Sequence, residues 1–123
     1  MKLTFQQLRI VNTNRCEQVF HSIDSWSIAD WAVALAGEAG ETCDAVKKLR
    51  RLQDGKNTSK DPQTVSQCIE NIRNELADTI IYADLLAAKL GIDLEKAIVR
   101  KFNIVSERMN SNIKLQDEVI NEG

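Results

Sequence analysis

The sequence has few of the prolines and glycines that end strands, and few of the cysteines that form disulfides or bind zinc. It holds one proline and five glycines in 123 residues, and alternating apolar and polar runs are few, so a sheet-based fold is not favoured. Cys16, Cys43 and Cys68 are an odd number of cysteines without C-x-x-C spacing, which argues against disulfides and zinc. We therefore expect a reducing, cytoplasmic location, with the cysteines as buried small apolar residues.

The sequence also lacks an excess of one charge and a long apolar run. Its 16 Lys and Arg against 18 Asp and Glu give a net charge of −2, which excludes a protein that coats nucleic-acid phosphates. The longest apolar run, residues 31–36, is too short to cross a bilayer, and the first residues do not resemble a signal peptide. We expect a soluble protein that binds neither nucleic acid nor membrane.

What the sequence does contain is apolar residues at spacings of three and four, which indicates helices. The prediction is an all-α, four-helix bundle-like single domain over residues 1–111, followed by a frayed or disordered tail over 112–123. Start and stop signals predict the four helices, which cover residues 4–21, 27–52, 61–90 and 93–109.

The segment 54–61 (DGKNTSKD) is rich in turn-forming residues and is the one clear loop, a candidate lid. The Asp61-Pro62 pair after it is typical of a helix start, and Gly91 is typical of a helix end.

Apolar residues surround nearly the whole third predicted helix between Leu76 and Leu90. Such a helix must be buried on more than one side. A partner subunit that packs on it, for example through Ile81 and Leu85, is the economical explanation. A monomer with the first helix wrapped over the third is the alternative.

Two pairs of carboxylates carry the strongest chemical signal. Glu38 and Glu41 lie three residues apart, and Glu75 and Asp78 repeat this spacing, so each pair shares one helix face. Both pairs adjoin the apolar stripe of their helix, and if these stripes pack together the four carboxylates converge. Taken alone, either pair reads as a solvated acidic surface, but two matching pairs beside core residues favour a site.

Four converging carboxylates repel one another in a low dielectric unless a cation neutralises them. Oxygen ligands select a hard ion. His21 is the single histidine and no helix carries E-x-x-H, which excludes a ferritin-like di-iron site. The expected cofactor is Mg²⁺, with Mn²⁺ as a possible substitute.

Two runs, WSIADWAVALAGEAGETCDAVKKLRR (26–51) and NELADTIIYADLLAAKLGIDLEKAIVRKFN (74–103), resemble the all-α nucleoside triphosphate pyrophosphatases of the MazG and dCTP pyrophosphatase superfamily. The similarity covers roughly residues 26–109. It implies hydrolysis of a (d)NTP to (d)NMP and pyrophosphate, with a deoxynucleotide (dCTP-like) or modified nucleotide cleared from the pool, and it implies a homodimer or homotetramer. The residues implied as metal ligands are Glu38, Glu41, Glu75 and Asp78, with Glu38 or Glu41 as the base that activates water.

Two positions depart from the pattern of this superfamily. Gly37 stands where many MazG sequences carry glutamate, which looks like the GExGE variant of the dCTP pyrophosphatase branch and leaves one carboxylate fewer. That branch often carries Lys and, four residues on, Asn near the fourth helix. Lys101 fits the first position, whereas the second is Val105, with Asn103 as the nearest substitute for a phosphate or sugar contact.

Four further residues have two readings each. Lys48 and Tyr82 lie on the carboxylate faces of their helices, where each could bind a phosphate. Alternatively, Lys48 only compensates the charge of a helix end and Tyr82 is a core residue. Trp31, two turns before Glu38, and Trp26, in the preceding turn, could stack on a nucleobase or could belong to the core.

Two other functions stay open at this point. One is a non-catalytic helical interaction module, in which the apolar third helix binds a partner. The other is an all-α phosphohydrolase that releases different products.

Overall fold

The computed structural model describes residues 2–116 and is built from helices, which confirms the all-α class. The α-helices are α1 (Phe5–Arg15), α2 (Ile28–Gln53), α3 (Val65–Lys89) and α4 (Leu94–Arg108), and residues 2–116 contain no strand. A π-helical turn, Cys16–Phe20, extends α1, and a 3-10 turn, Ile23–Ser25, precedes α2. Among these residues, no helix combines the length and apolar character that crossing a membrane requires.

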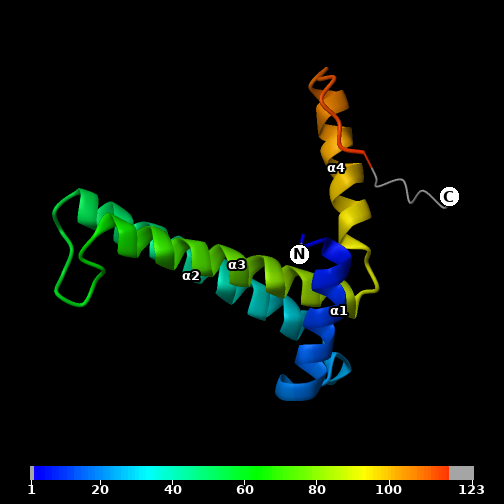
Figure 1. Cartoon of the computed structure of the whole chain (residues 1–123), viewed down its shortest axis with the longest axis horizontal. Coiled ribbons are helices and arrows are strands. Elements are labelled where there is room, and N and C mark those ends of the chain that lie inside the picture. Colours follow the sequence, from blue (N-terminus) through cyan, green and yellow to red (C-terminus); the bar gives the residue numbers. More distant parts are fainter. Residues whose placement is uncertain (1, 117–123) are drawn as a thin grey trace.

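The two longest helices, α2 and α3, pair side by side and form a long arm (Figure 1). Helix α1 crosses one end of this arm and contacts α3. Helix α4 leaves the same end and rises steeply away from the arm (Figure 1). Within one chain, the packed part is therefore the arm and α1, while much of α4 has no helix beside it.

Side chains cap the helix starts largely as the sequence predicts. Thr4 and Ser27 each accept a hydrogen bond from the backbone N–H three residues later, and each N-cap N–H is bound in return, which are complete capping boxes. Asp93 caps α4. Gly91 follows the end of α3 with a φ of 68°, a left-handed conformation that favours glycine.

The predicted start of the third helix at Asp61 is wrong. Helix α3 begins at Val65, and Thr64 is its cap in a box with Gln67. The Asp61 carboxylate is used elsewhere, because it accepts a hydrogen bond from the Thr58 N–H (3.0 Å) and pairs with Arg51 (2.7 Å). The loop before α3 is thus tied to the end of α2, at the tip of the arm far from α1 (Figure 1). This position does not favour the prediction that the segment 54–61 is a lid.

The core lies where α1 meets the arm. Trp31, Cys16 and Leu85 are its buried apolar residues, and Trp31 is 1% exposed. The Trp31 indole N–H donates a hydrogen bond to the Ile23 carbonyl (3.1 Å), which satisfies its polar atom inside the core. Leu85, expected at a subunit interface, is buried within the chain instead. Cys43, expected to be buried, is exposed.

A buried carboxylate fixes α1 to α3. Asp84 is 1% exposed and receives hydrogen bonds from Arg9 Nε (3.0 Å) and Asn12 Nδ2 (3.1 Å). Asn12 Nδ2 also donates to the Ile81 carbonyl (3.0 Å), and Arg9 reaches the Ile92 carbonyl (2.9 Å). A buried charge needs such partners, so this Asp84 network sets the position of α1.

The C-terminal segment is irregular after α4. Leu115 donates its N–H to the Asn103 side-chain oxygen (2.8 Å), and the Asn103 amide donates to the Leu115 carbonyl (2.7 Å). Of the tail predicted over 112–123, residues 117–123 lie outside the described residues.

Because Trp31 fills the core, Trp31→Ala should lower the free energy of unfolding by about 3–5 kcal/mol. Val33→Ala on the same helix is the control, since Val33 is 72% exposed and its truncation should change stability by less than about 0.5 kcal/mol. Thermal and urea denaturation followed by circular dichroism measure both. Equal, small losses in the two variants would contradict a core role for Trp31.

Candidate active site

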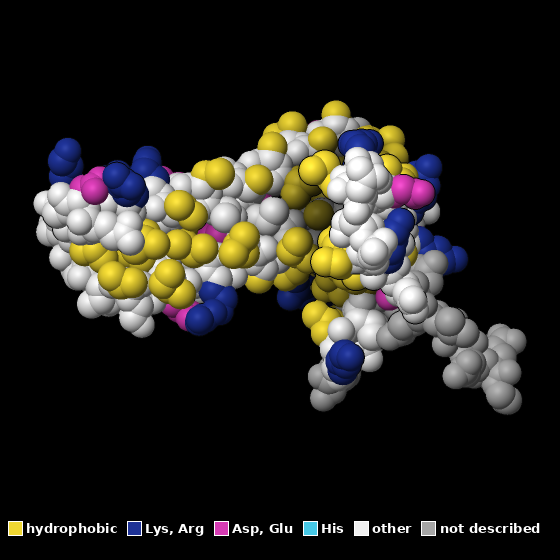
Figure 2. All heavy atoms as spheres, turned by 90° about the horizontal axis from the view of Figure 1, so that it is seen from above, with side chains coloured by type: hydrophobic (Ala, Val, Ile, Leu, Met, Phe, Trp, Pro, Cys, Tyr) yellow, Lys and Arg dark blue, Asp and Glu magenta, His cyan; other side chains and the backbone are white. Residues whose placement is uncertain are grey.

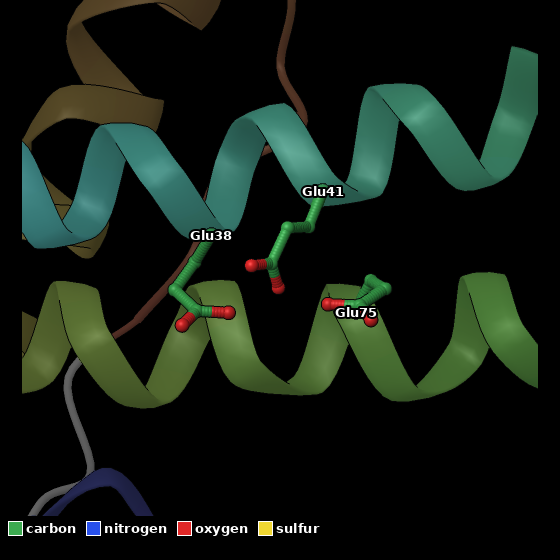
Figure 3. Close-up of side chains that lie close together, drawn as sticks. All are labelled: Glu38, Glu41 and Glu75. Carbon is green, nitrogen blue, oxygen red and sulfur yellow. The ribbon is translucent and has the colours of Figure 1, made fainter.

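Three carboxylates meet between α2 and α3. Glu38 and Glu41 project from α2 toward α3, and Glu75 projects from α3 into the same space (Figure 3). One oxygen from each lies within 4.8 Å of the others. The spacing of three residues puts Glu38 and Glu41 on one face of α2, as the sequence predicts. We call these three residues the carboxylate cluster.

Small and hydroxylated residues let the two helices approach at this level. The Thr42 and Thr79 hydroxyls are 3.0 Å apart across the α2–α3 seam, and each lies within hydrogen-bonding distance of the carbonyl oxygen four residues before it. Ala45 and Cys68 are buried further along the arm. This close packing directs the glutamates of the cluster toward one another.

The cluster is short of partners for its negative charge. Oε2 of Glu38 and Oε2 of Glu75 are buried and have no hydrogen-bond partner among residues 2–116. Burial, followed by repulsion from Glu41 and Asp78, raises the pKa of Glu38 above its ordinary value. Burial and the neighbouring Glu41 carboxylate likewise raise the pKa of Glu75. Carboxylate oxygens at this spacing are of the type that hard divalent cations bind, so the cluster is a candidate metal site.

Asp78 stands beside this cluster rather than inside it. Its side chain is exposed, and its oxygens are not part of the group within 4.8 Å. It is nevertheless close enough to Glu38 to raise the pKa of that residue. The structure thus brings three of the four predicted carboxylates together and leaves the fourth at the edge.

Lys48 lies near the opposite side of the cluster. Its ammonium group forms an ion pair with Asp44 (3.0 Å), and its charge counteracts part of the rise in the pKa of Glu75. A cation in this position is available to a phosphate bound next to the cluster.

A cavity of about 380 Å³ opens between the cluster and α1. Glu38 and Asp78 form part of one wall, and Tyr82 lies beside them. Burial, then the charges of Glu38 and Asp78, raises the pKa of Tyr82, so its hydroxyl keeps its proton and can donate. The remaining lining residues are Asn12, Arg15, Cys16, Phe20, His21, Trp26, Trp31, Ile81 and Leu85.

Aromatic rings make up much of this cavity. His21 stacks on Trp26 with ring centroids 4.2 Å apart, and Trp26 lies 4.7 Å from Trp31. The two tryptophans singled out in the sequence therefore both line the cavity, although Trp31 is also a core residue.

The sequence interpretation missed the contribution of α1 to this cavity. Asn12 and Arg15 lie one turn apart on α1 and both line it, with the Arg15 guanidinium 5.9 Å from the centre of the Phe20 ring. A polar Asn12 within an otherwise helical, partly apolar segment was the available signal, because asparagine in a helix interior is unfavourable without a specific partner.

The structure does not bring Lys101 and Asn103 to the cluster of the same chain. Both lie on α4, which points away from the arm (Figure 1). The Asn103 amide is already bound on both sides to the Leu115 backbone.

The raised pKa values of Glu38 and Glu75 make a prediction about the metal-free protein. An acid whose pKa is higher in the folded than in the unfolded chain holds more protons when folded, so this contribution to stability is lost as pH rises through the folded pKa. We expect the metal-free protein to gain stability from neutral pH down toward the ordinary glutamate value of 4.5.

Denaturant titrations between pH 7 and pH 5, with a chelator present, measure this effect. Glu38→Gln should flatten the pH dependence, and Glu107→Gln, at an exposed position outside the cluster, should leave it unchanged. A steep dependence that survives Glu38→Gln would contradict the assignment.

Comparison with known proteins agrees with this geometry. The family model described as the MazG nucleotide pyrophosphohydrolase domain matches residues 28–111, which is more than half of the chain and includes α2, α3 and α4. No curated protein gives a significant match. With the all-α fold and the carboxylates of α2 and α3 inside the matched region, the chain belongs to the MazG family and is a nucleotide pyrophosphatase.

Proposed function

We propose that the protein is a Mg²⁺-dependent pyrophosphohydrolase that converts a (d)NTP to (d)NMP and pyrophosphate. A deoxynucleotide, dCTP-like or modified, is the proposed substrate, and clearing it from a cytoplasmic nucleotide pool is the proposed role. The observation that carries this proposal is the carboxylate cluster, with two unpartnered buried oxygens, next to a cavity lined by aromatic rings.

Glu38, Glu41 and Glu75 are the proposed metal ligands, and Asp78 is a fourth ligand or a support at the edge. Mg²⁺ suits this oxygen-only donor set, and Mn²⁺ is a possible substitute. Bound there, the ion would supply Lewis-acid chemistry: it would offset negative charge on the phosphates and would make the attacking water more acidic.

Residues of the chain are proposed to supply the general base and the contacts to the phosphates. Glu38 or Glu41 accepts the proton of the attacking water as its oxygen bonds to the α-phosphorus. The bond from the α-phosphorus to the bridging oxygen breaks, and pyrophosphate leaves with that oxygen. The proposed phosphate contacts are the Lys48 ammonium group and the Tyr82 hydroxyl, which would hold the phosphates along the seam. The effect of the Lys48 charge on the pKa of Glu75 and the position of Tyr82 in the cavity lining support these roles.

The aromatic cavity is the proposed place of the base. Trp26 is only half-buried and lines the cavity, so it presents a ring face on which a base can stack. Trp31 forms a wall of the same cavity from inside the core.

Activity should require a divalent cation, and four variants should each lose activity. The loss should be at least about 100-fold at the three cluster positions, where a ligand or the base is removed, and about 10- to 100-fold at Asp78. The variants are Glu38→Gln, Glu41→Gln, Glu75→Gln and Asp78→Asn. Chromatography of products from a panel of NTPs and dNTPs with Mg²⁺, with and without chelator, measures this. Glu70→Gln, exposed on α3 outside the cluster, is the matched control.

The same experiment separates the alternatives. Full activity in any two of the four variants contradicts the site. Orthophosphate or nucleoside as the product would make the chain a different phosphohydrolase. Absence of both turnover and Mg²⁺ binding would instead favour a non-catalytic interaction module.

We also infer that a second copy of the chain covers the apolar faces left open, which gives a homodimer or homotetramer. Leu76 and Ile80 lie one turn apart on α3 and are 52% and 51% exposed. Figure 2 shows hydrophobic side chains along the arm. Helix α4 adds an apolar groove lined by Ile98, Phe102, Val105 and Met109. Exposed apolar faces that adjoin one another in this way are typical of protein–protein contact sites.

Light scattering at micromolar concentration should therefore give a mass that is a multiple of 13.8 kDa. Ile80→Glu should lower this mass while helical circular dichroism is kept, because Ile80 is exposed within one chain. Lys96→Glu, exposed on α4 outside the groove, controls for the added charge. A mass of 13.8 kDa for the unaltered protein would contradict the inference.

A further inference from the structure

We propose that the side-chain oxygen of Asn12 reads the edge of the base and selects a nucleobase that carries an exocyclic amino group. This inference rests on the proposed function, because it places the base in the aromatic cavity. It goes beyond that function by assigning specificity to a residue of α1, outside the region that matches the family model.

Asn12 is buried, yet it borders the cavity. It is 4% exposed and lines the cavity together with Tyr82 and the two tryptophans. Its Oδ1 takes part in none of the hydrogen bonds of the described residues, whereas Nδ2 makes two. Oδ1 is also not among the fully enclosed side-chain atoms that lack a partner. Oδ1 is therefore an unused acceptor that is not fully enclosed, and because Asn12 lines the cavity we assign this oxygen to the cavity wall.

The orientation of this amide is fixed by its surroundings. Nδ2 faces the Ile81 carbonyl and the Asp84 carboxylate, which are both acceptors. A turned amide would set its oxygen against these two oxygens and leave both unsatisfied, which is unfavourable inside a protein. Both amide hydrogens are thus engaged, and the wall that Asn12 presents to the cavity accepts but does not donate.

Arg9 does not line the cavity, but it fixes the Asp84 carboxylate that orients the Asn12 amide. Its Nε donates to Asp84 Oδ1, and the other carboxylate oxygen of Asp84 receives Asn12. Arg9 and Asp84 are therefore positioning residues for Asn12.

An acceptor-only wall discriminates among bases. The amino group of cytosine or adenine projects from the ring as a donor and can meet Oδ1 directly. The imide N–H of uracil or thymine lies between two carbonyl oxygens, which would approach Oδ1 with no donor from the amide to meet them. The shared feature selected is the amino group next to a ring nitrogen, as found in cytosine and in adenine.

The test measures binding of nucleoside monophosphates to the full chain in the presence of Mg²⁺. Tryptophan fluorescence is the readout, because Trp26 and Trp31 line the cavity. The unaltered protein should bind dCMP roughly tenfold more tightly than dUMP and than the analogue whose pyrimidinone ring lacks the amino group, the order expected for one hydrogen bond. The same comparison between dAMP and its amino-free purine analogue shows whether the cavity accepts the larger base.

Asn12→Leu should remove this preference, so that dCMP and its amino-free analogue bind equally. Asp84→Asn should weaken it, because an amide at position 84 can donate to Asn12 and allow the Asn12 amide to turn. Asn14→Leu, exposed on the same helix and outside the cavity, should keep the full preference. A merely structural role would lower melting temperature without changing the ratio of the two affinities.

Two results would overturn the proposal. One is equal binding of dCMP and its amino-free analogue, together with equal binding of dAMP and its analogue, by the unaltered protein, which needs no variant to fold. The other is a preference that persists in folded Asn12→Leu. Failure of the proposed function is a separate result, since it appears as absence of pyrophosphate release whatever the monophosphate affinities are.

Discussion

Repulsion among the carboxylates in the α2–α3 seam is the constraint on which the rest of the structure depends. Two helices that present acids to each other separate unless other contacts hold them. Here the arm continues on both sides of the cluster, with the paired hydroxyls of Thr42 and Thr79 within the seam and the tied loop at its tip. Packing along the rest of this long helical pair thus offsets the repulsion among the carboxylates. A shorter pair would have less packing to offset it.

The other end of the arm meets a different requirement. At that end, the turns next to α1 and α2 have to form the wall of the aromatic cavity without filling it. The π-helical turn after α1 and the 3-10 turn before α2 bring His21, Trp26 and Trp31 to one place. Hydrogen bonds such as that from the Trp31 indole to Ile23 satisfy the polar atoms, so the rings form a wall without burying unpaired groups.

The parts of the structure that local chemistry controls could be predicted from the sequence. Helix periodicity gave the class, Thr4 and Ser27 gave two helix starts, and the spacing of Glu38 and Glu41 gave the shared face. The start of α3 was mispredicted because Asp61 is recruited by Arg51, ten residues earlier, a tertiary contact that competes with its capping role. Local signals also contain nothing about the approach of Asn12 to Asp84, 72 positions away, or of Arg9 to Ile92, 83 positions away and just before α4.

The guanidinium of Arg9 joins two parts of the molecule that otherwise have separate tasks. One of its nitrogens binds the buried Asp84, and another binds the carbonyl of Ile92 in the short link between α3 and α4. That link follows Gly91, whose left-handed backbone sets the bend of the chain. The link that leads into α4 and the orientation of the buried Asn12 amide consequently share one anchor, the Arg9 side chain. Loss of the Arg9 side chain would therefore disturb both the link between α3 and α4 and the Asp84 carboxylate that holds Asn12 beside the cavity.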